Sequence, residues 1–248
     1  MQNKYKIAFL FSHPTQYHAP FFRFIAEKPD FDVTVYYCSK RGVEETLDPG
    51  FGKTYRWDIP LLYGYNSIFL KNWSLKPTPK FFGQINPGII KELEREKYDA
   101  LVVHGYNALT NWIAFFWCWL KKKPVILRGE AELREKTSPL KLTLKKIILR
   151  PLFKTMSAFL YSYTSNKNFF KFYGVPEERL FFHPCSVDNR FFSEEAKKFL
   201  PRKLKLRKKL KVQSPELPTV LYTGKFIQRK RIWDLLEAYK QLTTNNLK

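Results

Sequence analysis

The chain has 248 residues and a formal net charge of +22, with 44 lysines and arginines against 22 aspartates and glutamates. So much positive charge favours a polyanionic partner (nucleic acid, an anionic membrane or a phosphorylated ligand), although a lysine-rich coding bias would give the same charge. The 3 cysteines, Cys38, Cys118 and Cys185, are too widely spaced to indicate a disulfide or metal framework, and they fit a reducing cytosol. The apolar run Ile7–Phe11 is too short for a signal peptide, and Trp112–Leu120 is too short to cross a bilayer.

Strands are predicted where short apolar runs end in polar turns, and helices where apolar residues recur every three or four positions. The predicted strands are Lys6–Phe11, Val33–Tyr37, Ala100–Val103, Pro124–Leu127, Ala158–Tyr161 and Leu180–Phe182. The predicted helices are Phe21–Ala26, 89–93, Leu109–Leu120, the basic stretch 140–156 and Asn166–Tyr173. Residues 39–80 are predicted to form loops over one edge of the sheet. Phe115 and Trp119 indicate that helix 109–120 is buried on all sides. The alternation predicts an α/β fold, a Rossmann-like doubly wound parallel sheet.

The last part of the chain predicts only the beginning of a second domain. Pro218–Leu242 indicates a buried strand, a basic turn and a helix whose apolar stripe runs from Ile232 to Leu242. One strand and one helix cannot bury their own apolar faces, so we expect the first βα unit of a truncated second Rossmann-like domain. The expected divisions are a first domain at 1–192, a basic interdomain segment at 193–216 and the truncated domain at 217–248.

Ligands of doubly wound sheets bind at the carboxyl ends of the strands, and four polar turns follow predicted strands here. These turns are Ser12–His18, Gly105–Asn107, Arg128–Glu132 and His183–Asp188. His104, at the end of its strand, is placed to orient or deprotonate a hydroxyl, unless a neighbouring backbone group merely satisfies its ring. The candidate acceptor-binding residues are His13, Gln16, His18 and Glu130; their spacing does not support a metal site, and Glu130 could equally lie in a solvated turn.

A second candidate site lies in the turn ahead of the last helix. Gly224 lets a ligand approach the backbone, and Lys225 and Lys230 could hold a diphosphate together with the helix dipole. A solvated basic turn is the alternative. No phosphate-loop signature and no serine-hydrolase elbow occur in the chain.

The stretch 140–156 has two interpretations. Its apolar stripe and its basic residues could form a helix lying on an anionic membrane, or an ordinary surface helix whose stripe faces the core. Pro151 interrupts the pattern. The stripe consists of Leu140, Leu144, Ile147 and Ile148, and the basic residues are Lys141, Lys145, Lys146 and Arg150.

Two stretches resemble the family 4 glycosyltransferases of the GT-B fold. Leu160–Phe192 contains Tyr-Gly-Val-Pro-Glu-Glu-Arg-Leu and His-Pro-Cys-Ser-Val-Asp-Asn-Arg-Phe, which are similar to the run that closes the first domain of that family. Leu221–Leu242 is similar to the opening strand and helix of the family's second domain. Ser186 and Arg231 stand where the family usually has glycine, and the paired glutamates of its donor side have no counterpart.

The resemblance implies transfer of a sugar from a nucleotide-sugar donor to a saccharide or lipid-linked acceptor, with retention at the anomeric carbon. It implies that Lys225 and Lys230 contact the donor diphosphate, that His104 approaches the sugar, and that neither a metal nor another cofactor is needed. We expect a cytoplasmic protein. It could also bind peripherally to the inner face of the membrane. The alternative is a non-catalytic truncated remnant that binds an acceptor or a membrane surface. A nucleic-acid partner is not expected, because the basic run lacks interleaved stacking aromatics.

Overall fold

The computed structural model describes residues 4–48, 52–133, 138–212 and 219–245. The chain divides into two compact units. The first comprises Met1–Glu44 and Arg56–Asp188, and the second comprises Glu45–Tyr55 and Asn189–Lys248. Each unit is described by itself below, and the domain boundaries expected from the sequence stay predictions.

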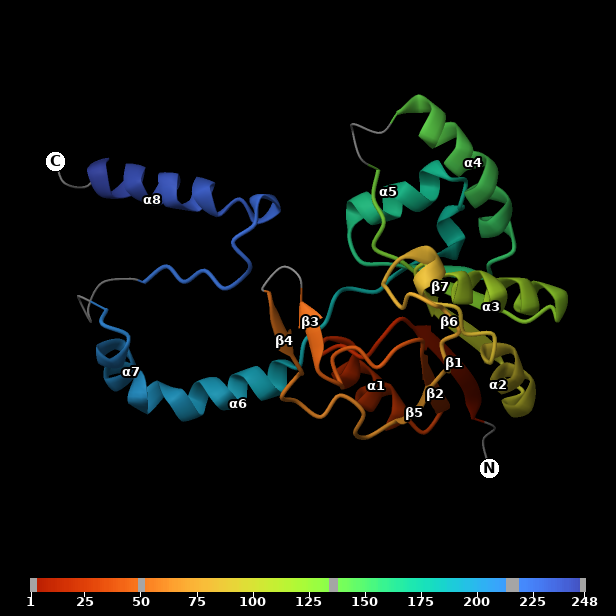
Figure 1. Cartoon of the computed structure of the whole chain (residues 1–248), viewed down its shortest axis with the longest axis horizontal. Helices are drawn as coiled ribbons and strands as arrows, with labels where there is room; N and C mark the ends of the chain where they lie inside the picture. The colour runs from red at the N-terminus through yellow and green to blue at the C-terminus, as the bar shows by residue number, and fades with distance from the viewer. Residues whose placement is uncertain (1–3, 49–51, 134–137, 213–218, 246–248) are drawn as a thin grey trace. The chain divides into compact units, whose positions relative to one another are not determined.

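The first unit is built on a seven-stranded sheet in which every neighbouring pair is parallel (Figure 1). The strand order is β5-β2-β1-β6-β7-β8-β9, so the chain moves outward from β1 first in one direction and then in the other. This confirms the predicted α/β class and doubly wound parallel sheet. The strands are β1 (Tyr5–Phe11), β2 (Phe31–Tyr37), β5 (Asn66–Phe69), β6 (Ala100–His104), β7 (Val125–Arg128), β8 (Ala158–Tyr161) and β9 (Leu180–Phe182).

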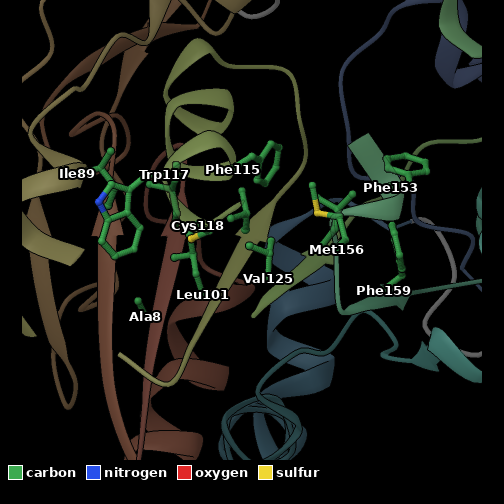
Figure 2. Close-up of a cluster of buried hydrophobic side chains, with 14 of the residues drawn as sticks. Ala8, Ile89, Leu101, Phe115, Trp117, Cys118, Val125, Phe153, Met156 and Phe159 are labelled. Carbon is green, nitrogen blue, oxygen red and sulfur yellow. The ribbon is translucent and has the colours of Figure 1, made fainter. Parts of the chain in front are cut away.

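Helices cover both faces of this sheet. Phe22 of α1 packs on one face in a cluster with Phe9 and Phe11, whereas α2, α3, α4 and α5 contribute buried side chains to the cluster on the other face. Figure 2 shows part of this second cluster, in which Phe115 and Trp117 of α3 lie among Ala8, Leu101 and Val125 of the strands. The helices are α1 (His18–Ala26), α2 (Ile89–Glu96), α3 (Leu109–Leu120), α4 (Pro139–Lys154) and α5 (Thr164–Phe172), with 3₁₀ turns at Phe81–Gly83 and Glu177–Arg179.

The apolar runs of the central strands follow from burial on both faces. In β1, Ala8 and Leu10 belong to the cluster under α2–α5, and Phe9 and Phe11 belong to the cluster under α1. Successive side chains of a strand point to opposite faces, so a strand covered on both faces must be apolar at every position. This is why the sequence alone identifies the central strands.

The segment 39–80 contains more regular structure than predicted. Asn66–Phe69 forms β5, which pairs in parallel with β2 at the edge of the sheet. Thr46–Asp48 and Lys53–Tyr55 form a short antiparallel hairpin, β3–β4, which belongs to the second unit. The expectation of loops alone was therefore wrong. These strands are short and half exposed, so they lack the continuous apolar run that marks a central strand.

One prediction about a helix was also wrong. Helix α3 is not buried all round, because Phe116, Trp119 and Leu120 are each more than half exposed. The predicted helical stretch 140–156 is confirmed as α4, which continues past Pro151 because a proline inside a helix removes one hydrogen bond without necessarily ending the helix. Among the residues described, no helix is long and apolar enough to pass through a membrane.

The second unit contains the hairpin and a set of helices. These are α6 (Asn189–Phe199), α7 (Lys203–Lys209) and α8 (Ile232–Asn245), with 3₁₀ turns at Leu200–Arg202 and Gln228–Lys230. The expected last helix is present, but residues 219–223 form no strand. Val220 and Leu221 are exposed, and a lone parallel strand has no hydrogen-bonding partner. Residues 213–218, which include the end of the predicted interdomain segment and Pro218, lie outside the described residues.

Candidate functional site

The candidate site lies where the strand order of the first unit reverses. Strand β1 pairs with β2 on one side and with β6 on the other, and the chain leaves β1 and β6 toward different faces of the sheet. Such a reversal opens a crevice beyond the carboxyl ends of the two strands. His13 and His18 follow β1, and His104 ends β6. The sequence therefore places three histidines at the position where open α/β sheets bind ligands.

Arg128, the last residue of β7, joins the residues of this edge. It is 4% exposed. Its Nη1 contacts His104 Nε2 at 3.0 Å and donates to Glu130 Oε1 at 3.0 Å. Its Nε donates to His183 Nδ1 at 3.5 Å. A buried guanidinium requires several acceptors, and here they come from the ends of β6, β7 and β9.

The contact with Arg128 fixes the protonation state of His104. A guanidinium can only donate hydrogen bonds, so His104 Nε2 must be the acceptor and the remaining ring proton is on Nδ1. The lone pair of Nε2 is therefore engaged, and the ring can donate from Nδ1 but cannot easily take up a proton. Of the two roles predicted for His104, this geometry favours orienting a hydroxyl over deprotonating it.

The neighbouring histidines are also held neutral. Burial lowers the pKa of His104 to about 3, and the charge of Arg128 acts in the same direction. Burial, followed by the proximity of His104 and Arg128, lowers the pKa of His18 to about 3. Burial and the charge of Arg41 lower the pKa of His13 to about 4. Near neutral pH, these rings serve as hydrogen-bonding groups without charge.

Ring contacts and hydrogen bonds orient the histidines. The ring centroids of His18 and His104 are 5.2 Å apart, and each ring packs against Phe11 with 4.8 Å between centroids. His18 Nδ1 lies 2.9 Å from Thr15 Oγ1, and His13 Nδ1 lies 2.8 Å from Ser12 Oγ. The aromatic wall and the two hydroxyls leave the rings little freedom to rotate.

A cavity of about 840 Å³ opens at the same edge of the sheet. This volume is sufficient for a saccharide-sized ligand. Polar groups line it from several elements, and they include Ser12, His104, Asn107, Glu130, Glu132 and Lys141.

Of the predicted acceptor residues, Glu130 lines this cavity, whereas His13, Gln16 and His18 follow β1 and are not among the residues that line it. The side chain of Glu130 is 46% exposed although one of its oxygens accepts from Arg128, so its other oxygen is accessible. The turn that carries it is anchored because Tyr163 Oη donates to the Glu130 carbonyl and Asn166 Nδ2 donates to the Ala131 carbonyl. Gln16 Oε1 is buried and accepts no hydrogen bond in this structure.

The predicted diphosphate-binding residues belong to the second unit. Lys225 Nζ lies 2.6 and 2.7 Å from the two carboxylate oxygens of Asp48, which is 8% exposed. Lys230 ends the 3₁₀ turn ahead of α8. A Cβ atom added to Gly224 would meet the Tyr222 hydroxyl at 2.8 Å, so a larger residue there would require the Tyr222 side chain to shift.

Arg231 has a left-handed backbone, with φ of 49° and ψ of 41°. This is the position at which the family resemblance leads one to expect glycine. Left-handed backbone favours glycine because it has no Cβ atom. Arg231 thus adopts the conformation that a glycine would supply, and its guanidinium pairs with Asp234 in the first turn of α8.

Sequence reasoning did not select Arg128 and His183 as site residues, although both lie in turns that it singled out. A signal was present, because an arginine that directly ends an apolar strand is placed to be buried. Among the described residues, no group of three or more His, Cys, Asp and Glu side chains is arranged to hold a metal ion. The independence from metal implied by the family resemblance stays a prediction.

The turn after His104 requires a special backbone. Gly105 has a φ of +76° and open space around its Cβ position, and Asn111 Nδ2 donates to its carbonyl at 3.0 Å. We expect Gly105→Ala to lower the free energy of unfolding by about 1–2 kcal/mol, because left-handed backbone penalises a Cβ atom. Gly88 also has open space but a φ of −58°, so Gly88→Ala should cost nothing. Urea unfolding of both variants measures the difference, and equal midpoints would contradict it.

The chain resembles known proteins in its three-dimensional structure and not in its sequence. No protein-family model matches the chain, and no curated protein matches it. The structure is similar to that of Anabaena HepE in complex with UDP and glucose, with a TM-score of 0.52 and 16% identity over 84% of this chain and 50% of that one. It is also similar to UDP-GlcNAc 2-epimerase from Neisseria meningitidis bound to UDP-GlcNAc, with a TM-score of 0.50 and 17% identity over 82% of this chain and 53% of that one.

This chain spans about half the length of the solved structures that it matches. At these identities the likeness establishes the fold, a Rossmann-like α/β sheet of the GT-B kind.

Proposed function

We propose that the chain is the acceptor-binding half of a glycosyltransferase that uses a nucleotide-sugar donor, together with the beginning of its donor half. The observation that carries the proposal is the cluster of neutral histidines around Arg128 at the carboxyl edge of the sheet, beside a polar cavity of about 840 Å³. Of the two structurally similar proteins, one is in complex with UDP and glucose and the other is bound to UDP-GlcNAc, and this supports a nucleotide-sugar substrate.

The uncharged imidazoles and the amide of the edge, together with the Glu130 carboxylate, are groups that suit the hydroxyls of a sugar. Neutral imidazoles, an amide and a carboxylate bind hydroxyl groups by directional hydrogen bonds. In this proposal His104 donates from Nδ1 to a hydroxyl of the transferred sugar. His13, Gln16, His18 and Glu130 bind the acceptor saccharide, and Glu130 is the one of these four that lines the cavity. The acceptor is a saccharide or a lipid-linked saccharide.

The donor diphosphate is assigned to the basic turn before α8. Lys225 and Lys230 would neutralise the charge that develops on the leaving diphosphate, and the start of α8 would add its dipole. No metal and no other cofactor take part in this scheme. The ion pair between Lys225 and Asp48 has to open, or to share the lysine, when the diphosphate binds.

Transfer can be tested with the whole chain, a panel of UDP-, GDP- and dTDP-sugars, and saccharide and polyprenyl-phosphate-linked saccharide acceptors. Coupled detection of the released nucleoside diphosphate reports turnover, and mass spectrometry identifies the product. We expect release that depends on both the acceptor and His104. His104→Gln should suppress it, and Glu178→Gln, an exposed carboxylate away from the edge, should not.

The outcomes separate the alternatives. Interconversion of a nucleotide sugar and its epimer without an acceptor would identify an epimerase and overturn transfer. Binding of the acceptor without any turnover would favour the alternative of a non-catalytic acceptor-binding remnant. Both the donor assignment and the acceptor assignment are wrong if no nucleotide sugar and no saccharide shifts the thermal unfolding of the chain.

The donor assignment predicts an effect on binding. Lys225→Ala and Lys230→Ala should each weaken nucleotide-sugar binding about 10- to 100-fold, since a hydrogen bond to a charged group contributes about 1.5–3 kcal/mol. Lys209→Ala in α7 removes the same charge outside the turn and serves as the matched control. Isothermal titration calorimetry measures the three affinities. Unchanged affinity in both turn variants would show that the diphosphate binds elsewhere.

A further inference from the structure

Helix α4 carries an apolar stripe on the side that faces away from the core. Leu149 and Phe153 are buried, at 3% and 2% exposure. Leu140, Leu144 and Ile147 lie about half a turn away around the helix, and they are 79%, 56% and 66% exposed. Ile148, beside them, is 44% exposed. The stripe is therefore not the core face that an ordinary surface helix would present, and the interpretation of this stripe as a core face is wrong.

Cations flank the stripe on both sides. Lys141 and Lys145 lie along one border, and Arg150 and Lys154 lie along the other. None of the four has an ion-pair partner among the residues that the structure describes. Pro139–Lys154 contains no aspartate or glutamate at all. The combination of an exposed apolar stripe and an unopposed cationic border is typical of helices that lie in a membrane interface.

A second exposed apolar group adjoins the end of α4. Phe116, Trp119 and Leu120 of α3 are 63%, 58% and 61% exposed, and Lys121–Lys123 follow them. A hollow at this place is lined both by Trp119 and Leu120 and by Thr155, the residue after α4. Tryptophan beside lysine is a frequent pairing at the boundary between lipid and water.

We propose that α4, with the adjoining end of α3, docks on the surface of an anionic phospholipid bilayer. Two other partners could cover this surface, a second copy of the chain and a nucleic acid, and the composition of the helix argues against both. A second copy of the chain would bring five further cations against the five of α4, at close range and without a counter-charge. A nucleic acid would satisfy the cations but would leave the apolar stripe in water. An anionic bilayer satisfies both, because its headgroups accept the cations and its acyl boundary covers the stripe.

The docking would determine what reaches the candidate site. Lys141 and Lys145 line the cavity that also contains His104 and Glu130, so the cationic border of α4 is one wall of that cavity. A bilayer against α4 would lie beside the cavity opening. A lipid-linked saccharide, with its lipid in the bilayer and its sugar in the cavity, is then the acceptor class that fits. This last step rests on the proposed function, whereas the docking does not.

The docking can be tested by flotation of the purified chain with vesicles at 0.1 M NaCl and no nucleotide sugar present. Vesicles of phosphatidylcholine alone are compared with vesicles that contain about 30 mol% phosphatidylglycerol, which gives the bilayer a negative surface potential. We expect strong binding to the anionic vesicles and little binding to the neutral ones. Because no donor is needed, failure of docking and failure of sugar transfer are distinguishable.

Two pairs of substitutions assign the surface. Ile147→Gln with Ile148→Gln should lower the partition coefficient at least tenfold, since it removes the centre of the stripe. Arg150→Gln with Lys154→Gln should lower it about 25-fold, because each cation near an anionic surface contributes about fivefold. Neither pair touches the residues assigned to the site. Leu75→Gln, a fully exposed leucine elsewhere in the first unit, is the apolar control and Lys91→Gln of α2 is the charge control.

Each of the following results would overturn the proposal. The first is equal binding to neutral and anionic vesicles. The second is binding that the charge pair abolishes and the stripe pair leaves unchanged, which would mean adhesion of a basic protein without insertion. The third is a dimer, seen by light scattering, that the stripe pair converts to a monomer, or a random 30-base-pair duplex that binds more tightly than the vesicles and depends on the same pairs. Circular dichroism confirms that each variant is folded before it is compared.

Discussion

Lowering the pH from 7 to 5 is expected to reduce the free energy of unfolding by about 4–6 kcal/mol. Three partly buried histidines have pKa values far below 6.5 in the folded chain, about 4 for His13 and about 3 for His18 and His104. In the unfolded chain they take up protons below pH 6.5, and in the folded chain they do not. The stabilisation is therefore complete above about pH 6.5 and is lost as the pH falls toward 3–4, at about 2 kcal/mol for each histidine by pH 5.

Urea unfolding between pH 7.5 and 5 measures this effect. His18→Phe is the informative variant, because the ring lies among Phe11, Phe22 and His104 and a phenyl group can replace it in the cluster. Removing one titrating group of three should reduce the slope of stability against pH by about a third. A change of less than 1 kcal/mol between pH 7 and 5 in the parent chain would contradict the assignment of buried neutral histidines.

If the chain transfers sugars as proposed, Arg128→Met is expected to reduce that transfer about 100- to 1,000-fold while leaving the chain folded. Methionine keeps much of the length of the side chain but loses the contacts to His104, Glu130 and His183. In the proposed function Arg128 is a positioning residue, and small displacements of site groups cost rates of this order. The pKa of His104 should also rise, because the guanidinium that lowers it after burial is removed.

The pKa of His104 separates positioning from a general loss of structure. Histidine ring resonances followed by NMR between pH 3 and 8 should show the titration of His104 moved upward in Arg128→Met. Arg95→Met on α2 removes an arginine whose ion pairs are on the surface, and it should alter neither the titration nor the rate. If the variant kept its rate and its His104 titration, Arg128 would have no part in organising the site.

The sheet of this chain was predictable because most of its strands are buried on both faces. A strand such as β6 must be apolar at every position, and that run is visible in the sequence as Ala-Leu-Val-Val. The edge strand β5 was missed because partial burial leaves it no such run. The last predicted strand does not form. Val220 and Leu221 have the composition of a strand but no neighbouring strand to pair with.

The site was predictable in its location and not in its organisation. Strand ends converge at one edge of a parallel sheet, so the turns after β1, β6, β7 and β9 could be selected from the sequence. Which side chain joins them depends on distances between strands that are remote in the sequence. Arg128 and His183 are 55 positions apart, and only the paired strands bring their side chains within hydrogen-bond distance.

The make-up of the second unit has a consequence for biosynthesis. Its hairpin, within Glu45–Tyr55, is translated early, whereas the rest of the unit begins only at Asn189. At ribosomal rates of about 5–20 residues per second, the hairpin leaves the ribosome roughly 7–30 s before its first partners exist. The parallel sheet of the first unit can form during that interval. We therefore expect nascent chains arrested near residue 188 to protect β1 and β6 from proteolysis while the 45–55 segment is still cleaved.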